Sequence, residues 1–235
     1  MFARRGSSDP MSFFIVLGFF CLIIGISIVQ SILDKKRREA IKNYCGRHGL
    51  SYKETASNVP SIAWSFSLLS EKGHSNTWQT EMSGNRGDYF FSIFEHHYVT
   101  GSGKSRHSHT DTICVLRNSA INMPQFFVRD ESLIFDSLGK LFGGQDINFS
   151  EDPVFSRKFV LQGMVEPSIR EFFDKNVRAV FVNHHITGYR YEGFRDCFAV
   201  SMSGSLDIDA RLAFLSCSMA IFKNIVPREE QEYLS

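Results

Sequence analysis

The sequence lacks the short signatures that mark the common kinds of active site. No G-x-S-x-G, H-E-x-x-H or D-x-D-x-D-G pattern occurs in its 235 residues, and it contains no internal repeat or low-complexity tract. Catalytic groups can converge in space from distant parts of a chain, so this absence disfavours an enzyme without excluding one. No catalytic residue and no cofactor is predicted from local motifs.

Cysteine pairs are also missing. The five cysteines are scattered along the chain and form no C-x-x-C pair: Cys21, Cys45, Cys114, Cys197 and Cys217. Proteins that are stabilised by disulfides are dense in cysteine and pair it. The sequence therefore indicates small buried hydrophobic side chains at these positions rather than a disulfide framework.

A strong excess of charge of either sign is absent as well. The formal net charge is +1; residues 1–38 carry +4, which leaves −3 for residues 39–235. Proteins that bind nucleic acid through bulk electrostatics present a strongly basic surface. A mildly acidic domain disfavours that class, and we expect no nucleic-acid partner.

One long segment has no charge at all. The 23 residues from Met11 to Leu33 contain no Asp, Glu, Lys or Arg. As a helix this segment is about 34 Å long at ~1.5 Å per residue, and the hydrocarbon core of a bilayer is ~30 Å thick. Four consecutive basic residues, Lys35 to Arg38, follow it directly, where a cleaved signal peptide has small residues instead. The sequence predicts a transmembrane helix at residues 11–33, with the lipid bilayer as its partner.

The basic residues also predict the orientation of this helix. Only Arg4 and Arg5 precede it, and Lys and Arg concentrate on the cytoplasmic side of membrane spans. We therefore expect a short extracytoplasmic tail at 1–10, a basic juxtamembrane helix at 34–49 and a cytoplasmic α+β domain at 50–235. The sequence thus predicts a single-pass protein of the cell membrane.

The residues after the span are rich in strand signals. Aromatic and β-branched residues at 76–84, 88–99 and 105–117 are separated by the turn sequences NRG and GSGK, which predicts three antiparallel strands in a meander. Further strands are predicted at 124–129, where the initial proline favours an edge, at 158–163, and in a second hairpin of 188–194 with 197–204.

Helices are predicted between and after these strands. The segments are 129–144, with Asp130 as its N-cap, 166–182, and 205–227 at the C-terminus. The last segment has a single apolar stripe at helical spacing: Ile208, Leu212, Leu215, Met219 and Phe222. Because hairpins and helices are segregated along the chain, the predicted class is α+β rather than a doubly wound parallel sheet.

The segment TGSGKS, Thr100 to Ser105, resembles the end of a phosphate-binding loop. Such a loop needs G-x-x-x-x-G-K-[ST] between a strand and a helix. The position of the first glycine is occupied by Tyr98, and the residues that follow are typical of a strand. We therefore interpret Gly101 and Gly103 as turn residues of a hairpin and expect no nucleotide to bind here.

Four of the eight histidines flank this turn. If paired positions sum to 205, His96 faces His109 with His107 diagonally adjacent; if they sum to 204, His97 faces His107 and Glu95 faces His109. Three imidazoles, or two with a carboxylate, are ligands that a catalytic zinc uses. His96, His107 and His109 are the candidate metal ligands, and the alternative is a solvated hairpin tip.

One stretch resembles a known family. Residues Met123 to Gly163 (MPQFFVRDESLIFDSLGKLFGGQDINFSEDPVFSRKFVLQG), with the glycine-centred hairpin VTGSGKSRHSHTDTICVL before them, are similar to a motif of uncharacterised bacterial single-span membrane-anchored proteins. The resemblance implies one span and one soluble domain, and it carries over no activity and no functional residue. Within the motif, four side chains are expected to pack and two to cap turns: Phe142, Ile147, Phe149 and Phe155, and Asp146 and Asp152.

Two functional hypotheses follow. The first is a membrane-tethered cytoplasmic domain without enzymatic activity that binds another protein or a second copy of itself. The alternative is a zinc-dependent enzyme or metal-binding domain built on the histidine-rich hairpin.

Overall fold

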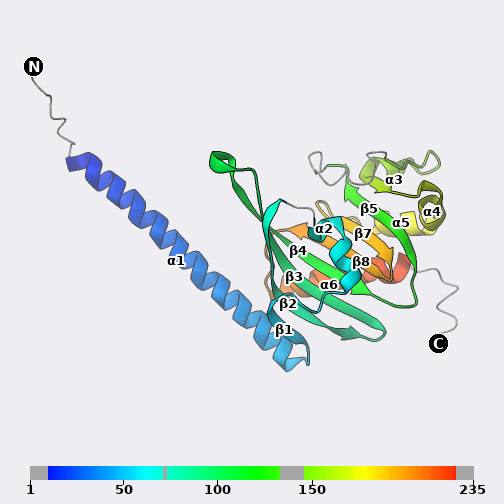
Figure 1. Cartoon of the computed structure of the whole chain (residues 1–235), viewed down its shortest axis with the longest axis horizontal. Helices are drawn as coiled ribbons and strands as arrows, with labels where there is room; N and C mark the ends of the chain where they lie inside the picture. Colours follow the sequence, from blue (N-terminus) through cyan, green and yellow to red (C-terminus); the bar gives the residue numbers. More distant parts are fainter. Residues whose placement is uncertain (1–9, 71–72, 133–145, 226–235) are drawn as a thin grey trace, which may run out of the picture.

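The computed structural model describes residues 10–70, 73–132 and 146–225. Its helices and short 3-10 turns are α1 (Pro10–Arg47), η1 (Ser61–Ser65), α2 (Ser67–Ser70), η2 (Gly103–Ser105), α3 (Pro153–Lys158), α4 (Glu166–Phe172), α5 (Lys175–Asn183) and α6 (Ile208–Ile225). Its strands are β1 (Ser51–Thr55), β2 (His74–Arg86), β3 (Tyr89–Thr100), β4 (His107–Arg117), β5 (Met123–Asp130), β6 (Phe159–Gly163), β7 (Arg190–Arg195) and β8 (Cys197–Ser203). An apolar N-terminal helix and an antiparallel sheet with helices, including the C-terminal α6, confirm the predicted α+β class (Figure 1).

Helix α1 is one continuous helix of 38 residues that projects away from the sheet domain (Figure 1). Its N-terminal part is apolar and exposed, and it is long and apolar enough to cross a membrane. Its C-terminal part packs on the domain, where Ile41 and Cys45 are buried. The helix ends where Gly49 takes a φ of +66° and Leu50 N–H donates to the Cys45 carbonyl at 3.0 Å. Of the predicted tail 1–10, only Pro10 is described. Helix α1 therefore fits a membrane anchor that continues into the domain without a break.

The eight strands form one sheet in the order β1-β2-β3-β4-β8-β7-β5-β6, in which every neighbouring pair is antiparallel. The predicted meander (β2, β3, β4) and the predicted second hairpin (β7, β8) are both present. The prediction of an edge for 124–129 is wrong, because β5 lies between β6 and β7. Pro124 is accommodated in an irregularity between Met123 and Phe126, where the ladder does not require its missing N–H.

The segment 166–182 forms two helices instead of the single one that we expected. Helix α4 ends at Phe172, and the Asp174 carboxylate accepts a hydrogen bond from the Val177 N–H at 2.8 Å, which caps a new helix, α5. The predicted helix at 129–144 begins inside β5, which ends at Asp130. Residues 133–144 of that prediction lie outside the described residues.

Each face of the sheet has its own core. On one face, α3 to α6 and the end of α1 cover a large cluster, into which Leu215, Met219 and Phe222 of the predicted α6 stripe pack. On the other face, residues 56–70 cover a smaller cluster. Two buried carboxylates on the strands hold this segment: Glu192 accepts from the Ser67 N–H at 3.0 Å, and Glu81 accepts from the Ser57 N–H at 2.8 Å.

The family-like motif packs as expected where it is described. Ile147, Phe149 and Phe155 are buried in the larger core, and the Asp152 carboxylate caps α3 by accepting from the Phe155 N–H at 3.1 Å. Asp146, expected to cap a turn, instead accepts from the side-chain amide of Gln162 in β6 at 2.9 Å. Phe142 lies outside the described residues.

Candidate functional site

The junction between α1 and the sheet domain contains a buried ion-pair cluster. Glu95 lies on β3 with its side chain fully buried, and it is bonded by Arg37 of α1 and by Arg211 of α6. Arg211 Nη2 lies 2.5 Å from Glu95 Oε1, and Arg37 Nη2 lies 3.1 Å from Glu95 Oε2. One carboxylate thus joins the anchor helix, the sheet and the C-terminal helix.

Both guanidinium groups also donate to backbone carbonyls, and Arg37 Nη2 lies 3.4 Å from Asp34 Oδ1 of its own helix. Arg211 Nη1 donates to the Thr80 carbonyl at 2.8 Å, and Arg37 Nη1 donates to the Leu206 carbonyl at 3.3 Å. Thr80 lies in a bulge of β2 with a φ of +56°, a conformation that a β-branched residue rarely adopts. The bulge turns a buried carbonyl toward Arg211, so the strand irregularity and the ion-pair cluster form one unit.

The environment of Glu95 stabilises its charged form. Burial by itself raises the pKa of the Glu95 carboxyl, but the nearby His97 imidazole, the hydrogen bond from Arg37 and the positive charges of Arg211 and Arg37 outweigh it and lower the pKa to about 2. Burial lowers the pKa of Arg211, and the Glu95 charge opposes that shift. The cluster is therefore ionised at neutral pH.

Sequence reasoning missed this cluster, although a signal for it exists. Glu95 interrupts the apolar segment of β3, and Arg211 precedes Leu215, Ser218 and Phe222 on the buried face of α6 at spacings of four, three and four. An isolated charge of each sign on a predicted core face indicates a buried pair. The partner on α1 could not be chosen from the four consecutive basic residues, because only the three-dimensional packing selects Arg37.

The histidine hairpin is present, but its register differs from both predicted alternatives. Paired positions of β3 and β4 sum to 207, so that His96 faces Asp111, Tyr98 faces His109 and Thr100 faces His107. The predicted sums of 204 and 205 are wrong because the loop is longer: it includes the 3-10 turn η2 between Thr100 and His107. The interpretation of Gly101 and Gly103 as turn residues is confirmed by their φ values of +71° and +55°.

His96, His107 and His109 share one face of this hairpin but lie in three successive cross-strand rows. Tyr98 lies between the rings of His96 and His109, with centroid separations of 5.1 and 5.0 Å. His96 Nε2 is 2.7 Å from Asn76 Oδ1, and His109 Nε2 is 2.7 Å from Thr100 Oγ1. No group of three or more His, Cys, Asp or Glu side chains suited to a metal occurs among the described residues. Metal binding by these histidines stays a prediction.

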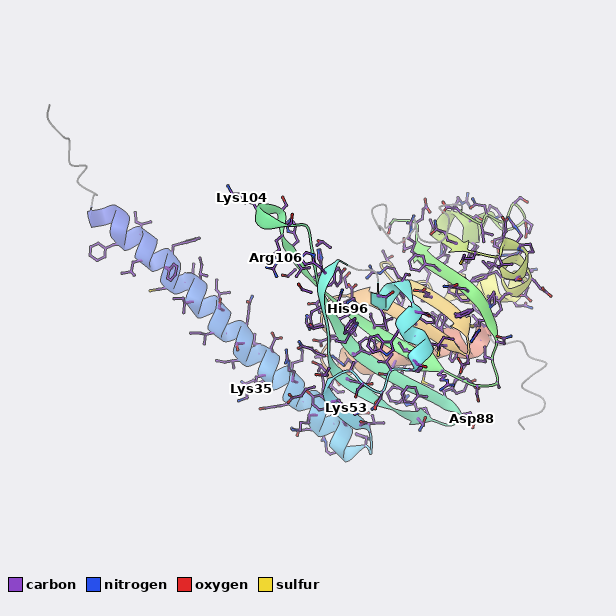
Figure 2. The ribbon with its side chains drawn as sticks, in the orientation of Figure 1. Lys35, Lys53, Asp88, His96, Lys104 and Arg106 are labelled. Carbon is purple, nitrogen blue, oxygen red and sulfur yellow. The ribbon has the colours of Figure 1, made fainter. Side chains whose placement is uncertain are left out.

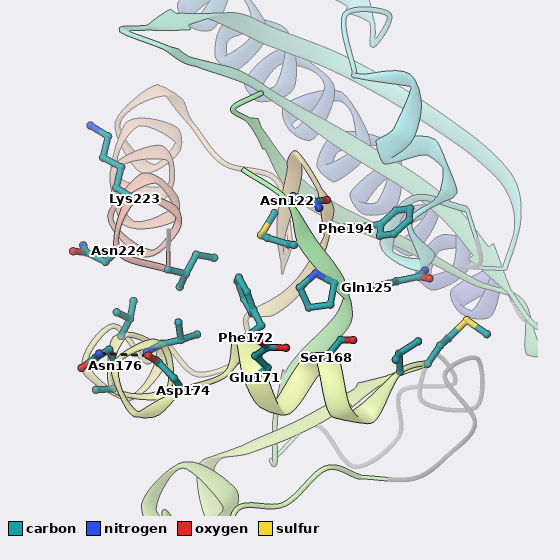
Figure 3. A pocket seen from close by; sticks show the side chains of 18 of the residues that line it. Asn122, Gln125, Ser168, Glu171, Phe172, Asp174, Asn176, Phe194, Lys223 and Asn224 are labelled. Carbon is teal, nitrogen blue, oxygen red and sulfur yellow. Dashed lines mark hydrogen bonds between the residues drawn. The ribbon is translucent and has the colours of Figure 1, made fainter. Parts of the chain in front are cut away.

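A groove with a volume of ≈1390 Å³ lies at the end of the sheet opposite α1, and we call it the distal groove (Figure 3). Its walls come from β5, α4, α5 and the last turn of α6. Side chains from each wall are labelled in Figure 3: Gln125, Phe172, Asn176 and Asn224. Sites for small molecules usually measure ~300–1,000 Å³, so this groove is large enough for an extended segment of another molecule.

The distal groove combines apolar and polar side chains. Apolar surface comes from Met164, Val165 and Phe172, whereas Asp174 and Lys223 contribute charges of opposite sign. Met164 is 73% exposed and Val165 is 56% exposed. A surface that mixes apolar side chains with a few polar and charged ones is compatible with protein binding. Sequence reasoning missed the groove because its walls come together from four elements that are distant in the chain.

The cysteines show no sign of nucleophilic activation. Burial raises the pKa of the Cys114 thiol to about 12, and burial together with the neighbouring Asp196 raises that of Cys197 to about 12. Both are thus neutral thiols at physiological pH. Cys45, Cys114 and Cys197 are buried core residues, as the sequence indicated, whereas the same prediction is wrong for Cys21, which is exposed on α1, and for Cys217, which is only partly buried.

No protein-family model matches the chain, and no curated protein matches its sequence. One solved structure has a similar fold: the mycobacterial trehalose monomycolate transport factor A, TtfA. The match has a TM-score of 0.56 and 11% sequence identity, and it covers 81% of this chain and 96% of that one. At this identity the similarity shows a shared fold.

Proposed function

We propose that this protein is a single-pass membrane protein whose sheet domain lies in the cytoplasm and binds a partner protein in the distal groove, without catalysing a reaction. The anchor is α1, and the Arg37–Glu95–Arg211 cluster fixes the domain to it. The groove lies at the opposite end of the sheet, so a partner reaches it without competing with the anchor for the same surface.

The distribution of exposed apolar side chains carries this proposal. Among the described residues outside α1, three large hydrophobic side chains are exposed: Val154, Met164 and Val165. Two of these three line the distal groove. Exposed apolar surface that gathers at one concave site is typical of a docking surface, since it costs free energy when left in water.

The comparisons support a role beside other membrane proteins. The similar fold of TtfA belongs to a protein that is described as a transport factor, and the motif at 123–163 resembles that of bacterial single-span anchored proteins. We extend the proposal accordingly: the partner is a component of a transport assembly in the bacterial cell membrane.

Site-specific cross-linking tests the groove. A photo-reactive amino acid at position 165, in the full chain expressed in its own membranes, is expected to capture one defined membrane protein. The matched control is position 154, which is also an exposed valine but does not line the groove. In a second series the photo-reactive amino acid replaces Ala179, which also lines the groove. Capture from this position should be abolished by the double change Met164→Asp/Val165→Asp and left unchanged by Val154→Asp.

Two outcomes would contradict the proposal. Equal capture from positions 154 and 165 would show that the groove is not selective. Capture of a second copy of this chain, lost in the Met164→Asp/Val165→Asp protein, would replace the partner protein by self-association.

The orientation needs its own test. Because basic residues follow the span, a reporter that requires an extracytoplasmic location should give no signal when it is fused after Ser235. The same reporter before Met1 should be active. The opposite pattern would place the domain outside the cytoplasm.

Metal binding by the hairpin is the second candidate function, because three imidazoles share one face of it. Metal analysis of the purified full chain decides between the two. Stoichiometric zinc that is lost in His107→Ala and His109→Ala proteins would favour the metal-dependent function.

A further inference from the structure

The tip of the β3–β4 hairpin is a basic, fully exposed projection on one side of the domain. Every residue from Gly101 to His109 is exposed, and the segment from Thr100 to Thr110 contains Lys104 and Arg106 but no Asp or Glu. Neither cation forms an ion pair with any residue in the described part of the chain. A projection of this kind has its charge available for a ligand of opposite sign.

The direction of the hairpin indicates where that ligand lies. In Figure 1 the hairpin and the apolar part of α1 leave the domain on the same side and extend in the same direction. Lys104 and Arg106 therefore project from the domain toward the side on which α1 enters the membrane (Figure 2). The distal groove, at the other end of the sheet, does not share this side.

The hairpin is stiff enough to hold its tip in place. His96, Tyr98 and His109 form a continuous ring stack along one face, which Trp78 extends at a centroid distance of 5.4 Å from His96. Cross-strand hydrogen bonds join Thr100 to His109 at 2.7 Å and His97 to Thr110 at 2.8 Å. This stack gives His96 and His109 a structural role, because their rings support the two strands below the turn.

The junction cluster fixes the position of the hairpin relative to the membrane. Glu95, which bonds Arg37 of α1, is on β3, the same strand that runs on to the tip. The distance between anchor and tip is thus set by one strand and one ion-pair cluster. Basic side chains that are held beside a membrane are attracted to the anionic lipids of the cytoplasmic leaflet.

We infer that the β3–β4 tip is a second membrane contact, in which Lys104 and Arg106 bind the headgroups of anionic phospholipids. The inference rests on the proposed membrane anchor and cytoplasmic orientation, but it does not depend on the partner in the groove. The exposed Lys35, Lys36 and Arg38 of α1 and the hairpin tip then contact the same leaflet at two separate points. Two contacts define the rotation of the domain about the axis of α1, which the anchor alone does not define.

Hydrogen–deuterium exchange of the full chain in nanodiscs tests this inference. One set of nanodiscs contains phosphatidylcholine alone, and the other contains phosphatidylcholine mixed with phosphatidylglycerol. We expect amide exchange at 101–106 to be roughly tenfold slower in the anionic nanodiscs at low salt, because two cations gain a headgroup contact there. High salt should reverse the difference.

Two variants assign the effect to the tip. Lys104→Gln/Arg106→Gln should remove the difference between the two lipid mixtures. Arg86→Gln/Lys175→Gln also removes two exposed cations, but these lie away from the tip, so the difference should remain. Equal exchange at 101–106 in both mixtures, or an unchanged difference in the Lys104→Gln/Arg106→Gln protein, would overturn the inference.

The same experiment separates this inference from its premise. Amides of residues 11–33 should be strongly protected in both mixtures if α1 spans the bilayer. Protection of 11–33 without lipid-dependent slowing at the tip would overturn only the second contact. Rapid exchange at 11–33 would overturn the anchor and the tip contact together.

Discussion

The two ends of the sheet are held together by different kinds of interaction. At the proximal end, where β1 to β3 meet α1, the packing includes a fully buried carboxylate between two guanidinium groups. At the distal end, where β5 to β7 meet α3 to α5, phenylalanine rings pack at centroid distances such as 4.9 Å for Phe126 with Phe173 and 5.5 Å for Phe173 with Phe181. The distal end also has an ion pair, between Arg178 and Asp152 at 3.0 Å, but the fully buried carboxylate between two guanidinium groups belongs to the proximal end.

This difference has a physical consequence. A buried ion pair tolerates only one placement of its partners, because any shift leaves a charge unpaired in the interior. Aromatic packing stabilises through contact area and through the preferred stacked or edge-to-face geometry of each ring pair. The proximal end is therefore suited to hold the anchor in one orientation.

The largest effect should come from removing the charge at the proximal end. Glu95→Ala leaves the fully buried Arg211 without its anion, and it should lower the free energy of unfolding by about 3–5 kcal/mol. Denaturant titration of the full chain in detergent measures this change. Glu166→Ala is the control, because it breaks an exposed pair with Arg170 and should cost less than about 1 kcal/mol. Equal losses would mean that the buried cluster does not hold the anchor.

Shortening a side chain of the helix that bridges the two ends should have the next largest effect. Leu215 of α6 is 1% exposed, and α6 packs against α1, β4 and α5. Leu215→Ala should cost about 2–5 kcal/mol, the usual range for a buried leucine. An unchanged thermal unfolding midpoint of the Leu215→Ala protein would show that the apolar stripe of α6 binds a partner instead of stabilising the domain.

Acid should weaken the proximal end selectively. The pKa of Glu95 is about 2 in the folded protein and 4.5 in the absence of perturbation, so its contribution is complete above pH 4.5 and is lost as the pH falls toward 2. The shift corresponds to roughly 3 kcal/mol of stability. The unfolding free energy of the wild-type protein should therefore fall across this range more steeply than that of Glu95→Gln. Parallel pH profiles would refute the assignment to Glu95.

The smallest effect on stability is expected at the hairpin tip. Lys104 is exposed and lies in the 3-10 turn η2, so Lys104→Ala should change the unfolding free energy by less than about 0.5 kcal/mol. Titration with a nucleoside triphosphate provides a second check. Tight nucleotide binding that disappears in Lys104→Ala would show that the turn is a phosphate-binding loop after all.

The spacing of residues along the chain predicted those helices and strands that depend mainly on their own sequence. The uncharged run of α1, the strands of both hairpins and the stripe of α6 follow from residue spacing alone, and the structure contains each of them. Where a local signal was misjudged, a single residue explains the error. Asp174 is a helix cap within a pattern that otherwise continues, and Pro124 is placed in an irregularity of an interior strand.

The functional surfaces could not be predicted in this way. Glu95 and Arg211 are 116 positions apart, and the groove draws side chains from segments between Asn122 and Ile225. The hairpin register depends on whether the loop contains a 3-10 turn, which GSGK does not specify. Each of these features depends on how elements that are remote in sequence pack together. Short sequence motifs therefore do not reveal them.

Because α1 is one unbroken helix, a change in the direction of its apolar part also moves the domain that packs on its other end. No flexible linker separates the apolar part of the helix from the part that packs on the domain, and the junction cluster resists bending there. A transmembrane helix tilts when the thickness of the bilayer changes. Each change of tilt then swings the domain as one body, and the displacement is greatest at the distal groove because it lies farthest from the pivot. Under the proposed function, the tilt of α1 in the bilayer therefore sets the height of the distal groove above the membrane.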